Sequence, residues 1–363
     1  MSRATVSHRV VLIPGDGIGP EVVDAARRAI EATGVRFAWD VRDLGAVALE
    51  RHGTPLPQAA LESIAACGVA LKGPVATPAH AGFRSVNLAL RDRLGLQAGI
   101  RPARTWPGAP APVGPLDVVV VRMLAGDLYA GIEFPAGTEA TARLRQIVAE
   151  TRGSVIPLDA GVSLKPISPA QSRAVVGIAL TFAREHGRRK VTVVHKATVM
   201  RATDGLFLAA ARDASSDAEG DVLLDDRLVD TICHDLVARP GSCDVLLTTM
   251  LYGDLLSDLC AGLTGGLGLA PGANVGQACA VFEAVHGTAA RHAGRNRANP
   301  MAVILSGAML LRHIGEQTAA DRLEGAVAAV IADGRTLTYD LAGARGSEPS
   351  STTAVAEAVV AAL

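Results

Sequence analysis

The stretch from Thr248 to Gly272, TTMLYGDLLSDLCAGLTGGLGLAPG, leads from a short apolar run through a turn to two acidic residues four positions apart. The run 244–249, DVLLTT, has the composition of a buried strand, LYGD has that of a turn, and 254–263 is expected to be a helix. Residues at i and i+4 share one face of a helix, so Asp254 and Asp258 point the same way. Such a pair can bind Mg²⁺ or Mn²⁺ together with oxygens of a substrate. It can also be a solvated pair near the positive end of a helix, and the pair alone does not decide.

Size and charge limit the class of protein. A chain of 363 residues can form two domains with sizeable cores. Because 49% of residues are apolar and only 3% aromatic, those cores are built from Ala, Val, Leu and Ile. The net charge is −1 and no basic stripe alternates with aromatic residues, which argues against nucleic acid as the main partner. No apolar run approaches the length of a membrane span, and residues 1–9 lack the apolar centre of a signal peptide.

The cysteines indicate a reducing compartment. There are five, at positions 67, 233, 243, 260 and 279, and none forms a C-x-x-C pair. An odd, scattered set of this kind is typical of reduced thiols. We therefore expect buried thiols in a cytoplasmic protein.

Apolar runs and helical patterns alternate along the chain. Strands are predicted at 10–13, 35–41, 69–72, 116–122, 190–195, 244–249 and 280–285. Helices are predicted after PGDGIGPE and at 57–66, 86–94, 168–187, 204–214, 225–238, 299–315 and 318–333. This alternation favours an α/β fold with a largely parallel sheet. The Pro- and Gly-rich segment 102–115 is expected to be a loop, and the irregular segment 127–168 an inserted arm.

The glycines of PGDGIGPE do not by themselves indicate a dinucleotide-binding turn. Gly15, Gly17 and Gly19 follow the spacing G-x-G-x-G, and no acidic residue ends a second strand at the expected distance. The pattern is therefore not assigned to phosphate binding.

Polar residues near one helix start outline an anion site. Ser85, Asn87 and Arg91 fall in the first turns of the predicted helix 86–94. Free N–H groups, a hydroxyl, an amide and a guanidinium can together bind an anion, although Ser85 can also be an ordinary helix cap beside an exposed Arg91. Arg101 follows in IRP, and Arg122 ends a buried strand, where it needs a carboxylate partner. Three convergent arginines would prefer a di- or tricarboxylic acid.

Three further residues are candidates for chemistry. Lys196 ends the strand KVTVVHK, where burial can lower its pKa enough for it to accept a proton, or where it can extend into solvent. Tyr129, in DLYAGIEF, can be catalytic or simply half buried. Asp230 can complete an oxygen-rich metal site with Asp254 and Asp258, but spacing alone does not bring it there. His195 is expected to serve packing or a hydrogen bond.

Taken together, the chain resembles the metal-dependent β-decarboxylating dehydrogenases, the isocitrate/isopropylmalate dehydrogenase family, and isocitrate dehydrogenases in particular. The resemblance runs nearly end to end. Its segments are IPGDGIGPEV, LKGPVATP, RSVNLALR, IRPAR, DLYAGIEF, LKPIS, VTVVHKATVMRATDGLF, LYGDLLSDLCAGLTGGLG, EAVHGTA, AGRNRANP, ILSGAMLLRH and TYDL. It implies the family's fold, in which two α/β domains flank a cleft: a discontinuous large domain (1–97 and 265–363) on the cofactor side, a small domain (98–126 and 169–264) with substrate, metal and dimer interface, and an intersubunit arm (127–168).

The same resemblance implies roles for individual residues. The substrate carboxylates fall to Ser85, Asn87, Arg91, Arg101 and Arg122. Tyr129 and Lys196 match the catalytic pair, and Asp254 and Asp258 match ligands of Mg²⁺ or Mn²⁺. Family members donate Lys196 and Asp230 from the neighbouring subunit, so a homodimer with shared active sites is implied.

The substrate is expected to be isocitrate or a similar 2-hydroxy acid, oxidised and decarboxylated to a 2-oxo acid and CO₂. Ser85 and Asn87 are polar, as in isocitrate dehydrogenases, whereas an isopropyl group would leave them unpaired. The chain departs from the family at 123–126, where Met-Leu-Ala-Gly replaces the usual E-N-S/T-E, at Thr198, at Met250, and at His80-Ala81 before Ser85. Losing two acids would allow a more negative substrate such as phosphonomethylmalate; homoisocitrate and isopropylmalate are further alternatives.

The cofactor signal is divided. The resemblance places Thr77, Glu283, His286, Gly287, Thr288, Arg291, His292, Asn299 and Tyr339 at cofactor-contacting positions. NAD users usually have Asp where this chain has Arg291, and Arg291, His292 and Tyr339 suit a 2′-phosphate. A further Arg of some NADP users is Gly343 here. NADP is therefore favoured, with NAD as the alternative.

One alternative of another class is a non-catalytic regulatory subunit of a heteromeric isocitrate dehydrogenase. Such subunits bind ligands but lose catalytic side chains. Tyr129, Lys196, Asp230, Asp254 and Asp258 are all present, which favours an enzyme.

Overall fold

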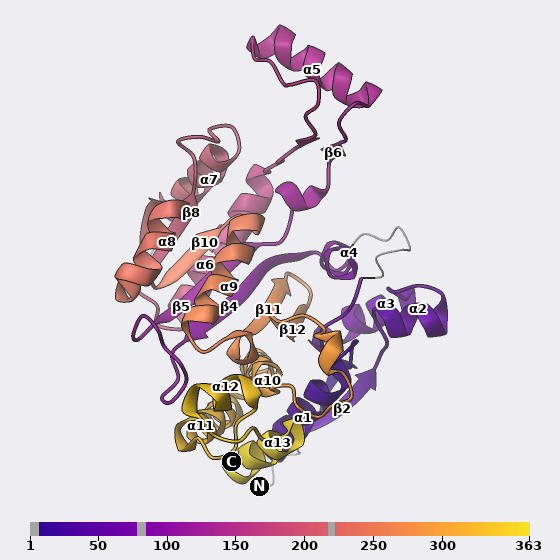
Figure 1. The fold of residues 1–363 in the computed structure, drawn as a ribbon, viewed down its shortest axis with the longest axis vertical. Coiled ribbons are helices and arrows are strands. Elements are labelled where there is room, and N and C mark those ends of the chain that lie inside the picture. Colours follow the sequence, from indigo (N-terminus) through magenta and orange to yellow (C-terminus); the bar gives the residue numbers. More distant parts are fainter. Residues whose placement is uncertain (1–6, 78–84, 217–221) are drawn as a thin grey trace.

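One large sheet, with helices on both faces, organises the molecule (Figure 1). The computed structural model describes residues 7–77, 85–216 and 222–363, so the departure at His80 and Ala81 lies outside the described residues. The predicted α/β class is confirmed. The strands are β1 (Ser7–Ile13), β2 (Arg36–Val41), β3 (Val69–Lys72), β4 (Leu96–Arg104), β5 (Asp117–Met123), β6 (Glu133–Phe134), β7 (Val162–Ser163), β8 (Lys190–His195), β9 (Leu223–Leu228), β10 (Val245–Thr248), β11 (Pro271–Gly276) and β12 (Ala280–Ala284).

The large sheet is parallel at both ends and antiparallel in its middle. Its strand order is β2-β1-β3-β12-β11-β4-β5-β10-β8-β9. Strands β11 and β4 run antiparallel to each other, and each also runs antiparallel to its outer neighbour, β12 or β5. The carboxyl ends of β5, β10 and β8 therefore lie along one edge, where Arg122 and Lys196 stand.

Helices cover both faces of each half of the sheet. They are α1 (Gly19–Ala32), α2 (Ala46–His52), α3 (Gln58–Cys67), α4 (Val86–Arg93), α5 (Glu139–Arg152), α6 (Pro169–Glu185), α7 (Asp204–Ser216), α8 (Val229–Ala238), α9 (Met250–Leu263), α10 (Met301–His313), α11 (Gln317–Asp333), α12 (Tyr339–Arg345) and α13 (Thr352–Ala361). Around β1 and β3, the apolar core packs α1, α10, α11 and α13 on one face and α3 and α4 on the other. Around β5, β8 and β10, α6 and α7 pack on one face and α8 and α9 on the other. The exact bounds of the two domains stay a prediction.

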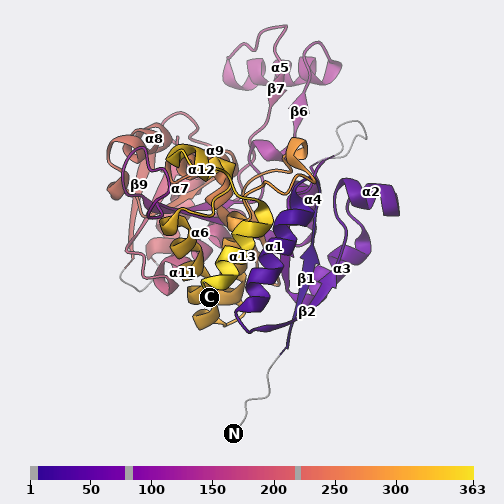
Figure 2. The same cartoon turned by 60° about the horizontal axis from the view of Figure 1, so that its bottom comes forward.

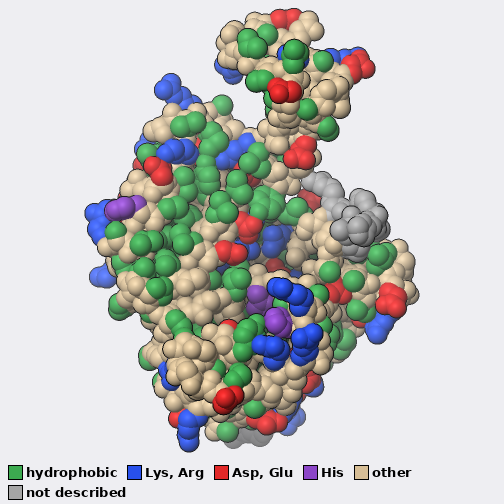
Figure 3. All heavy atoms as spheres, viewed as in Figure 1, with side chains coloured by type: hydrophobic (Ala, Val, Ile, Leu, Met, Phe, Trp, Pro, Cys, Tyr) green, Lys and Arg blue, Asp and Glu red, His purple; other side chains and the backbone are tan. Residues whose placement is uncertain are grey.

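The segment that includes α5, β6 and β7 stands away from the rest of the molecule (Figures 1 and 2). Strands β6 and β7 form a separate antiparallel pair, and α5 has only Thr141 buried. Hydrophobic side chains reach its surface (Figure 3): Val155 is 84% exposed and Leu158 77% exposed. Exposed apolar side chains do not stabilise an isolated chain, so this segment is suited to contact with another protein surface.

Two expected elements are wrong in position. The segment 225–238 is not one helix, because Leu223–Leu228 forms strand β9 against β8 before α8 begins at Val229. Likewise β4 extends to Arg104, since it pairs along its length with β5, so the predicted loop at 102–115 begins only after it. Both errors arise because pairing with a neighbouring strand overrides local composition.

The cysteine and membrane expectations have different outcomes. All five cysteines are free thiols, and Cys243, Cys260 and Cys279 are buried as expected. Cys233 is exposed on α8 and Cys67 is partly exposed, so the expectation of burial is wrong for them. Within the described residues, no helix has the length and apolar character needed to cross a membrane.

Candidate active site

Helix α9 carries the two acids, and it starts earlier than its sequence indicates. It begins at Met250, directly after β10, so LYGD forms its first turn instead of a separate turn. A Cβ added to Gly253 would lie 2.5 Å from the Cγ of Arg122. Gly253 therefore allows the Arg122 side chain to lie directly against the helix, beside Asp254.

Three predicted side chains meet at the carboxylate of Asp254. Arg122, from the end of β5, pairs with Asp254 Oδ1, and the Tyr129 hydroxyl donates to Oδ2. Arg101, from β4, lies 3.3 Å from Oδ1 and donates to Ser257 Oγ at 2.6 Å. Arg122 is 1% exposed. The expectation that this buried strand-end arginine needs a carboxylate partner is thus confirmed.

The cluster shifts the pKa values of its members. Burial would raise the pKa of Asp254, but Arg122, Tyr129 and Arg101 together lower it below its usual range. Burial and the neighbouring Arg101 lower the pKa of Arg122 to about 10, so it remains charged at neutral pH. Burial and the hydrogen bond to Asp254 raise the pKa of Tyr129. The phenol therefore keeps its proton at neutral pH and can act as a proton donor.

Asp258 is the uncommitted acid of the pair. It stands one turn after Asp254 and is exposed, and its carboxylate accepts no hydrogen bond and forms no ion pair within the described part of the chain. Burial, and then the like charge of Asp254, raise its pKa, while Arg101 opposes the shift. A free carboxylate beside a second one is a chemically suitable partial site for a hard divalent cation.

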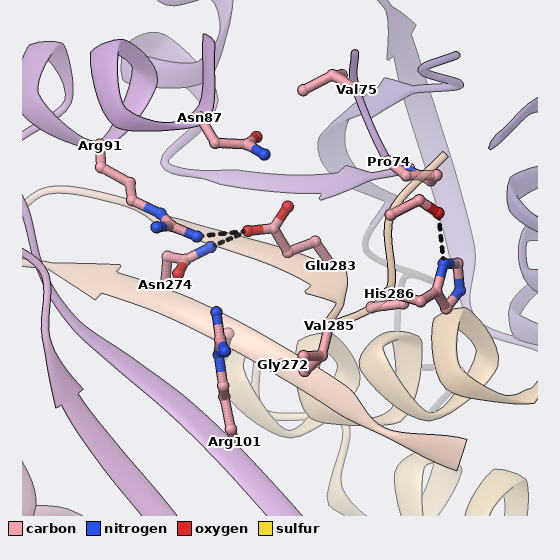
Figure 4. Close-up of a pocket in the computed structure, with 13 residues that line it drawn as sticks. Pro74, Val75, Asn87, Arg91, Arg101, Gly272, Asn274, Glu283, Val285 and His286 are labelled. Carbon is pink, nitrogen blue, oxygen red and sulfur yellow. Dashed lines mark hydrogen bonds and ion pairs between the residues drawn. The ribbon is translucent and has the colours of Figure 1, made fainter. Parts of the chain in front are cut away.

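A second set of charges lies on the other side of Arg101, around a cavity of about 100 Å³ (Figure 4). Glu283 pairs with Lys72 and with Arg91, whose Nη2 lies 3.4 Å away, and accepts a hydrogen bond from Asn274 at 2.6 Å. The sequence analysis named neither Lys72 nor Asn274. The cavity is lined by Pro74, Val75, Asn87, Arg91, Arg101, Gly272, Ala273, Asn274, Glu283, Ala284, Val285, His286 and Gly287.

The cavity has a charge-balanced wall and unused hydrogen-bonding atoms. Burial alone would raise the pKa of Glu283, but Lys72 and Arg91 lower it to about 2, so it is ionised at neutral pH. Burial lowers the pKa of His286, which is therefore neutral. Asn87 Oδ1 and His286 Nε2 are buried without a protein partner. Buried polar atoms of this kind normally bind something, so the cavity is suited to a polar ligand.

The start of α4 is a helix cap as well as a candidate anion site. Ser85 Oγ accepts a hydrogen bond from Leu88 N at 3.4 Å, the ordinary capping contact. Thr77 Oγ1 accepts one from Val86 N at 3.1 Å. The Arg91 side chain is buried instead of exposed, which removes the alternative of a cap beside an exposed arginine.

The glycine-rich turn after β1 supports the segments around the cavity. Gly15 and Gly17 have positive φ, and a Cβ on either would lie 2.2 Å from a backbone oxygen, of Pro74 and Thr288 respectively. Asp16 between them is buried and accepts three backbone N–H groups, from Ala46, Val47 and Ala76. The turn therefore fixes the backbone next to Thr77 and Thr288, a role that G-x-G-x-G spacing did not reveal.

Lys196 and Asp230 form a pair of their own at the surface. Their Nζ and Oδ1 atoms lie 2.6 Å apart. Asp230 does not join Asp254 and Asp258 in this chain: across the described ranges no three His, Cys, Asp or Glu side chains lie close enough to hold a metal. His195 makes the expected hydrogen bonds, to Asp226 at 3.1 Å and from Ala197 N at 3.0 Å.

Of the residues predicted to contact a cofactor, three line the cavity (Glu283, His286 and Gly287) and the others lie outside its lining. His286 and Gly287 line it, and the Thr288 carbonyl accepts a hydrogen bond from Ile18 N. Asn299 is buried between Asp340 and the start of α10, where its amide is already used. The remaining three form an outer group: Arg291 is exposed, and the rings of His292 and Tyr339 lie 5.5 Å apart.

The departure at 123–126 is partly structural. Met123 and Leu124 are buried in two different apolar cores, which accounts for their apolar character. The segment also lines a hollow of about 540 Å³ next to Tyr129 and Arg91. Gly126 has a positive φ, and a Cβ there would lie 2.7 Å from the carbonyl oxygen of Pro166, so this turn favours glycine.

Comparison with known proteins agrees with this arrangement. A family model described as isocitrate/isopropylmalate dehydrogenase matches residues 9–359. A Drosophila melanogaster protein named as a probable mitochondrial NAD isocitrate dehydrogenase subunit alpha is 40% identical, covering 94% of this chain and 85% of its own length. An NADP isocitrate dehydrogenase of Archaeoglobus fulgidus is 36% identical, covering 95% and 90%.

A solved structure gives the same result for the fold. The crystal structure of isocitrate dehydrogenase from Methylococcus capsulatus superposes with a TM-score of 0.88 at 45% identity, covering 98% of this chain and 99% of that one. The predicted family fold is therefore confirmed. The chain belongs to the isocitrate/isopropylmalate dehydrogenase family, a family of decarboxylating dehydrogenases.

Proposed function

We propose that the protein catalyses the oxidative decarboxylation of isocitrate, or of a similar 2-hydroxy acid, to a 2-oxo acid and CO₂, with a nicotinamide cofactor and a divalent metal ion. The observation that carries the proposal is the meeting of Arg101, Arg122 and Tyr129 at Asp254. These groups come from β4, β5, the turn after β5, and α9, and the meeting joins cations, an acid and a proton donor at one place. Relatives named isocitrate dehydrogenase support the reaction.

The arginines and the helix start would bind the substrate. Burial, and then the charges of neighbouring arginines, lower the pKa values of Arg101 and Arg122, so Arg91, Arg101 and Arg122 together make the site locally positive. Such a site attracts a substrate with several carboxylates. Asn87, with its free Oδ1, would bind a hydroxyl or amide group close to them. Ser85, whose hydroxyl caps α4, would contribute from the same helix start.

Asp254 and Asp258 would hold Mg²⁺ or Mn²⁺, with Asp230 of a second subunit. When bound, the metal supplies Lewis-acid polarisation of the substrate oxygen at C2. Asp258 is free for this role, and Asp254 would exchange some of its contacts with Arg101, Arg122 and Tyr129 for it. The fit rests on hard oxygen donors, which these cations prefer.

The proton transfers would fall to two side chains. Lys196 would accept the proton of the substrate's C2 hydroxyl group while hydride passes from C2 to the nicotinamide. Tyr129 would donate a proton to the carbon that CO₂ leaves, and its raised pKa keeps that proton available. Arg101 and Arg122 would hold the carboxylates in place during both steps.

The active site would be shared in a homodimer. Within one chain Lys196 and Asp230 contact each other and not the acids of α9. The exposed apolar side chains Val155 and Leu158 provide a surface for the second copy. Light scattering and mixing of Lys196 and Asp254 variants, with activity restored in the mixture, would test the arrangement.

NADP is the proposed cofactor, and NAD is the alternative. Relatives of both preferences match the chain. Arg291, His292 and Tyr339 favour the phosphate-bearing form, because an arginine and two ring groups suit a 2′-phosphate better than the ribose hydroxyls.

One assay tests the proposal. Purified protein with Mn²⁺ is offered isocitrate, homoisocitrate, isopropylmalate, tartrate and phosphonomethylmalate, each with NAD or NADP, and cofactor reduction is followed. We expect the highest kcat/KM with isocitrate or a close analogue. No cofactor reduction with any combination of substrate and cofactor would contradict the proposal. It would favour a non-catalytic, ligand-binding subunit; the Drosophila melanogaster relative is itself named as a subunit.

The hollow beside Tyr129 favours a second candidate substrate. It has a volume of about 540 Å³ and is lined by the uncharged segment 123–126, by Arg91 and Arg93, and by one acid, Asp92. Because two cations face one acid and segment 123–126 is uncharged, a bulkier and more negative group than a carboxylate would be accommodated. A phosphonate in place of one carboxylate meets this description, and a higher kcat/KM for phosphonomethylmalate than for isocitrate would establish it.

A cytoplasmic location stays a prediction.

A further inference from the structure

Arg297 lies against Tyr339, which belongs with Arg291 and His292 to the outer group described above. Its guanidinium carbon is 4.4 Å from the ring centroid of Tyr339, a cation–π arrangement. The ring of His292 also lies near, 5.5 Å from that of Tyr339 and tilted by 35°. Tyr339 is 39% exposed, so its ring contacts Arg297 and His292 at the surface instead of in the core.

This group carries positive charge that the chain itself does not neutralise. In the described part of the chain, Arg291 and Arg297 form no ion pair with an acid. The nearest acid by sequence to Tyr339 is Asp340, and its two oxygens are used by Asn299 and Thr338. On the face drawn in Figure 3, basic and histidine side chains gather beside the central hollow. Unpaired arginines in such a place are suited to an anion.

A second observation points to a ligand at the same place. Nδ1 of His292 is buried and has no hydrogen-bond partner. A buried ring nitrogen left open normally meets a polar group of a ligand or water. Position 343, where a further arginine would serve some NADP users, is Gly343 here, and a Cβ there would meet nothing within 4 Å. The space at that position is open.

We propose that Arg297 is the second cation of the 2′-phosphate site and that it positions the Tyr339 ring through the face of its guanidinium. A guanidinium can stack on a ring with its face while the N–H groups of its edge bind phosphate oxygens. Arg297 thereby replaces the arginine that is absent at position 343. The proposal rests on the proposed NADP preference and extends it to a residue with no earlier assignment.

The test measures nucleotide binding without the reaction. Adenosine 2′,5′-bisphosphate and ADP are titrated calorimetrically into wild type, Arg297→Met, Arg297→Lys and the control Arg295→Met. We expect Arg297→Met to weaken binding of the 2′-phosphate ligand about tenfold or more and binding of ADP less than about threefold. Arg297→Lys keeps the charge but not the stacking plane and should fall between. Arg295→Met removes an equal charge two positions away and should change the ratio less than about twofold.

The possible results distinguish a failure of the NADP preference from a failure of the role assigned to Arg297. A wild type that prefers ADP contradicts the NADP preference itself, whatever Arg297 does. A wild type that prefers the 2′-phosphate ligand, with equal ratios in Arg297→Met and Arg295→Met, overturns the assignment of Arg297 alone. If Arg297→Met does not fold, Arg297→Gln is measured in its place with the same expected loss. In the activity assay, the matching result is a raised KM for NADP with kcat unchanged.

Discussion

Two lysine–carboxylate pairs of this molecule differ in what surrounds them. Lys72 and Glu283 are direct neighbours in the register of β3 and β12, and their side chains are 1% and 12% exposed. Lys196 and Asp230 lie at the carboxyl edge of the sheet, and their side chains are 29% and 62% exposed. Arg91 and Asn274 complete the first pair, whereas among the described residues the side chains of Lys196 and Asp230 form an ion pair only with each other.

This difference in exposure separates a charged pair that stabilises the fold from one that is accessible to another molecule. A buried charge must be paired, because removing one partner leaves the other uncompensated in a poorly solvated place. An exposed pair contributes little to stability. The first pair therefore supports the fold of the cavity wall, while the second is available for the proposed chemistry. Four predictions, ordered by the size of the expected effect, test this contrast between the buried and the exposed pair.

The largest expected effect is on turnover at the exposed pair. Lys196→Met removes the proposed proton acceptor, so kcat should fall about a thousandfold, as is typical for loss of a general base. Because the Lys196 side chain pairs with the exposed Asp230, and the backbone hydrogen bonds of Lys196 do not depend on its side chain, the unfolding transition should stay close to wild type. Steady-state kinetics with Mn²⁺ and the best substrate, together with thermal unfolding, measure both.

Lys190→Met is the matched control for that substitution. Lys190 begins the same strand, and its Nζ bonds the Ser242 carbonyl, far along β8 from the site. Its loss should leave kcat within about threefold of wild type. Near-normal turnover in Lys196→Met would remove the lysine from the mechanism.

The next effect is on stability at the buried pair. Glu283→Gln leaves the ammonium of Lys72 buried without its counter-charge, which should lower the free energy of unfolding by about 3 kcal/mol at neutral pH. Lys72→Met should cost less, since Glu283 keeps Arg91 and Asn274 as partners. Urea unfolding of both variants measures the order, and the reverse order would contradict the account of this network.

Acidification should narrow the gap between wild type and Glu283→Gln. The pKa of Glu283 is lowered from 4.5 to about 2 in the folded chain. Its contribution is therefore complete above about pH 4.5 and is lost as the pH falls from there toward about 2. Between about pH 4.5 and 3, the difference in unfolding free energy should shrink by roughly 2 kcal/mol. A difference that stays constant over this range would show that Glu283 titrates normally.

Local spacing was enough to predict some of the site. Asp254 and Asp258 share a face because a helix repeats about every four residues, and Arg122 needs an acid because its strand is buried. Both inferences use only neighbouring residues and the cost of burying charge, and the contact between Arg122 and Asp254 confirms the second.

Long-range pairing accounts for what was missed. Lys72 faces Glu283 only because β3 lies next to β12 in a sheet whose strand order does not follow the chain. For the same reason, Leu223–Leu228 adds a strand beside β8 although its sequence continues into a helical pattern. Asp16 was overlooked because its three N–H partners come from segments up to 60 positions away.

The smallest expected effect on stability belongs to Asp230, and it separates the two roles of the exposed pair most sharply. The hydrogen bond with Lys196 lowers the pKa of Asp230, but the side chain is largely exposed, so Asp230→Asn should shift the melting temperature by less than about 2 °C. The Mn²⁺ concentration for half-maximal activity should nevertheless rise about tenfold or more, because a hard anionic ligand is lost from the proposed site shared between two subunits. A metal requirement equal to that of wild type would leave Asp230 a surface ion-pair partner, and the active site would then be complete within a single chain.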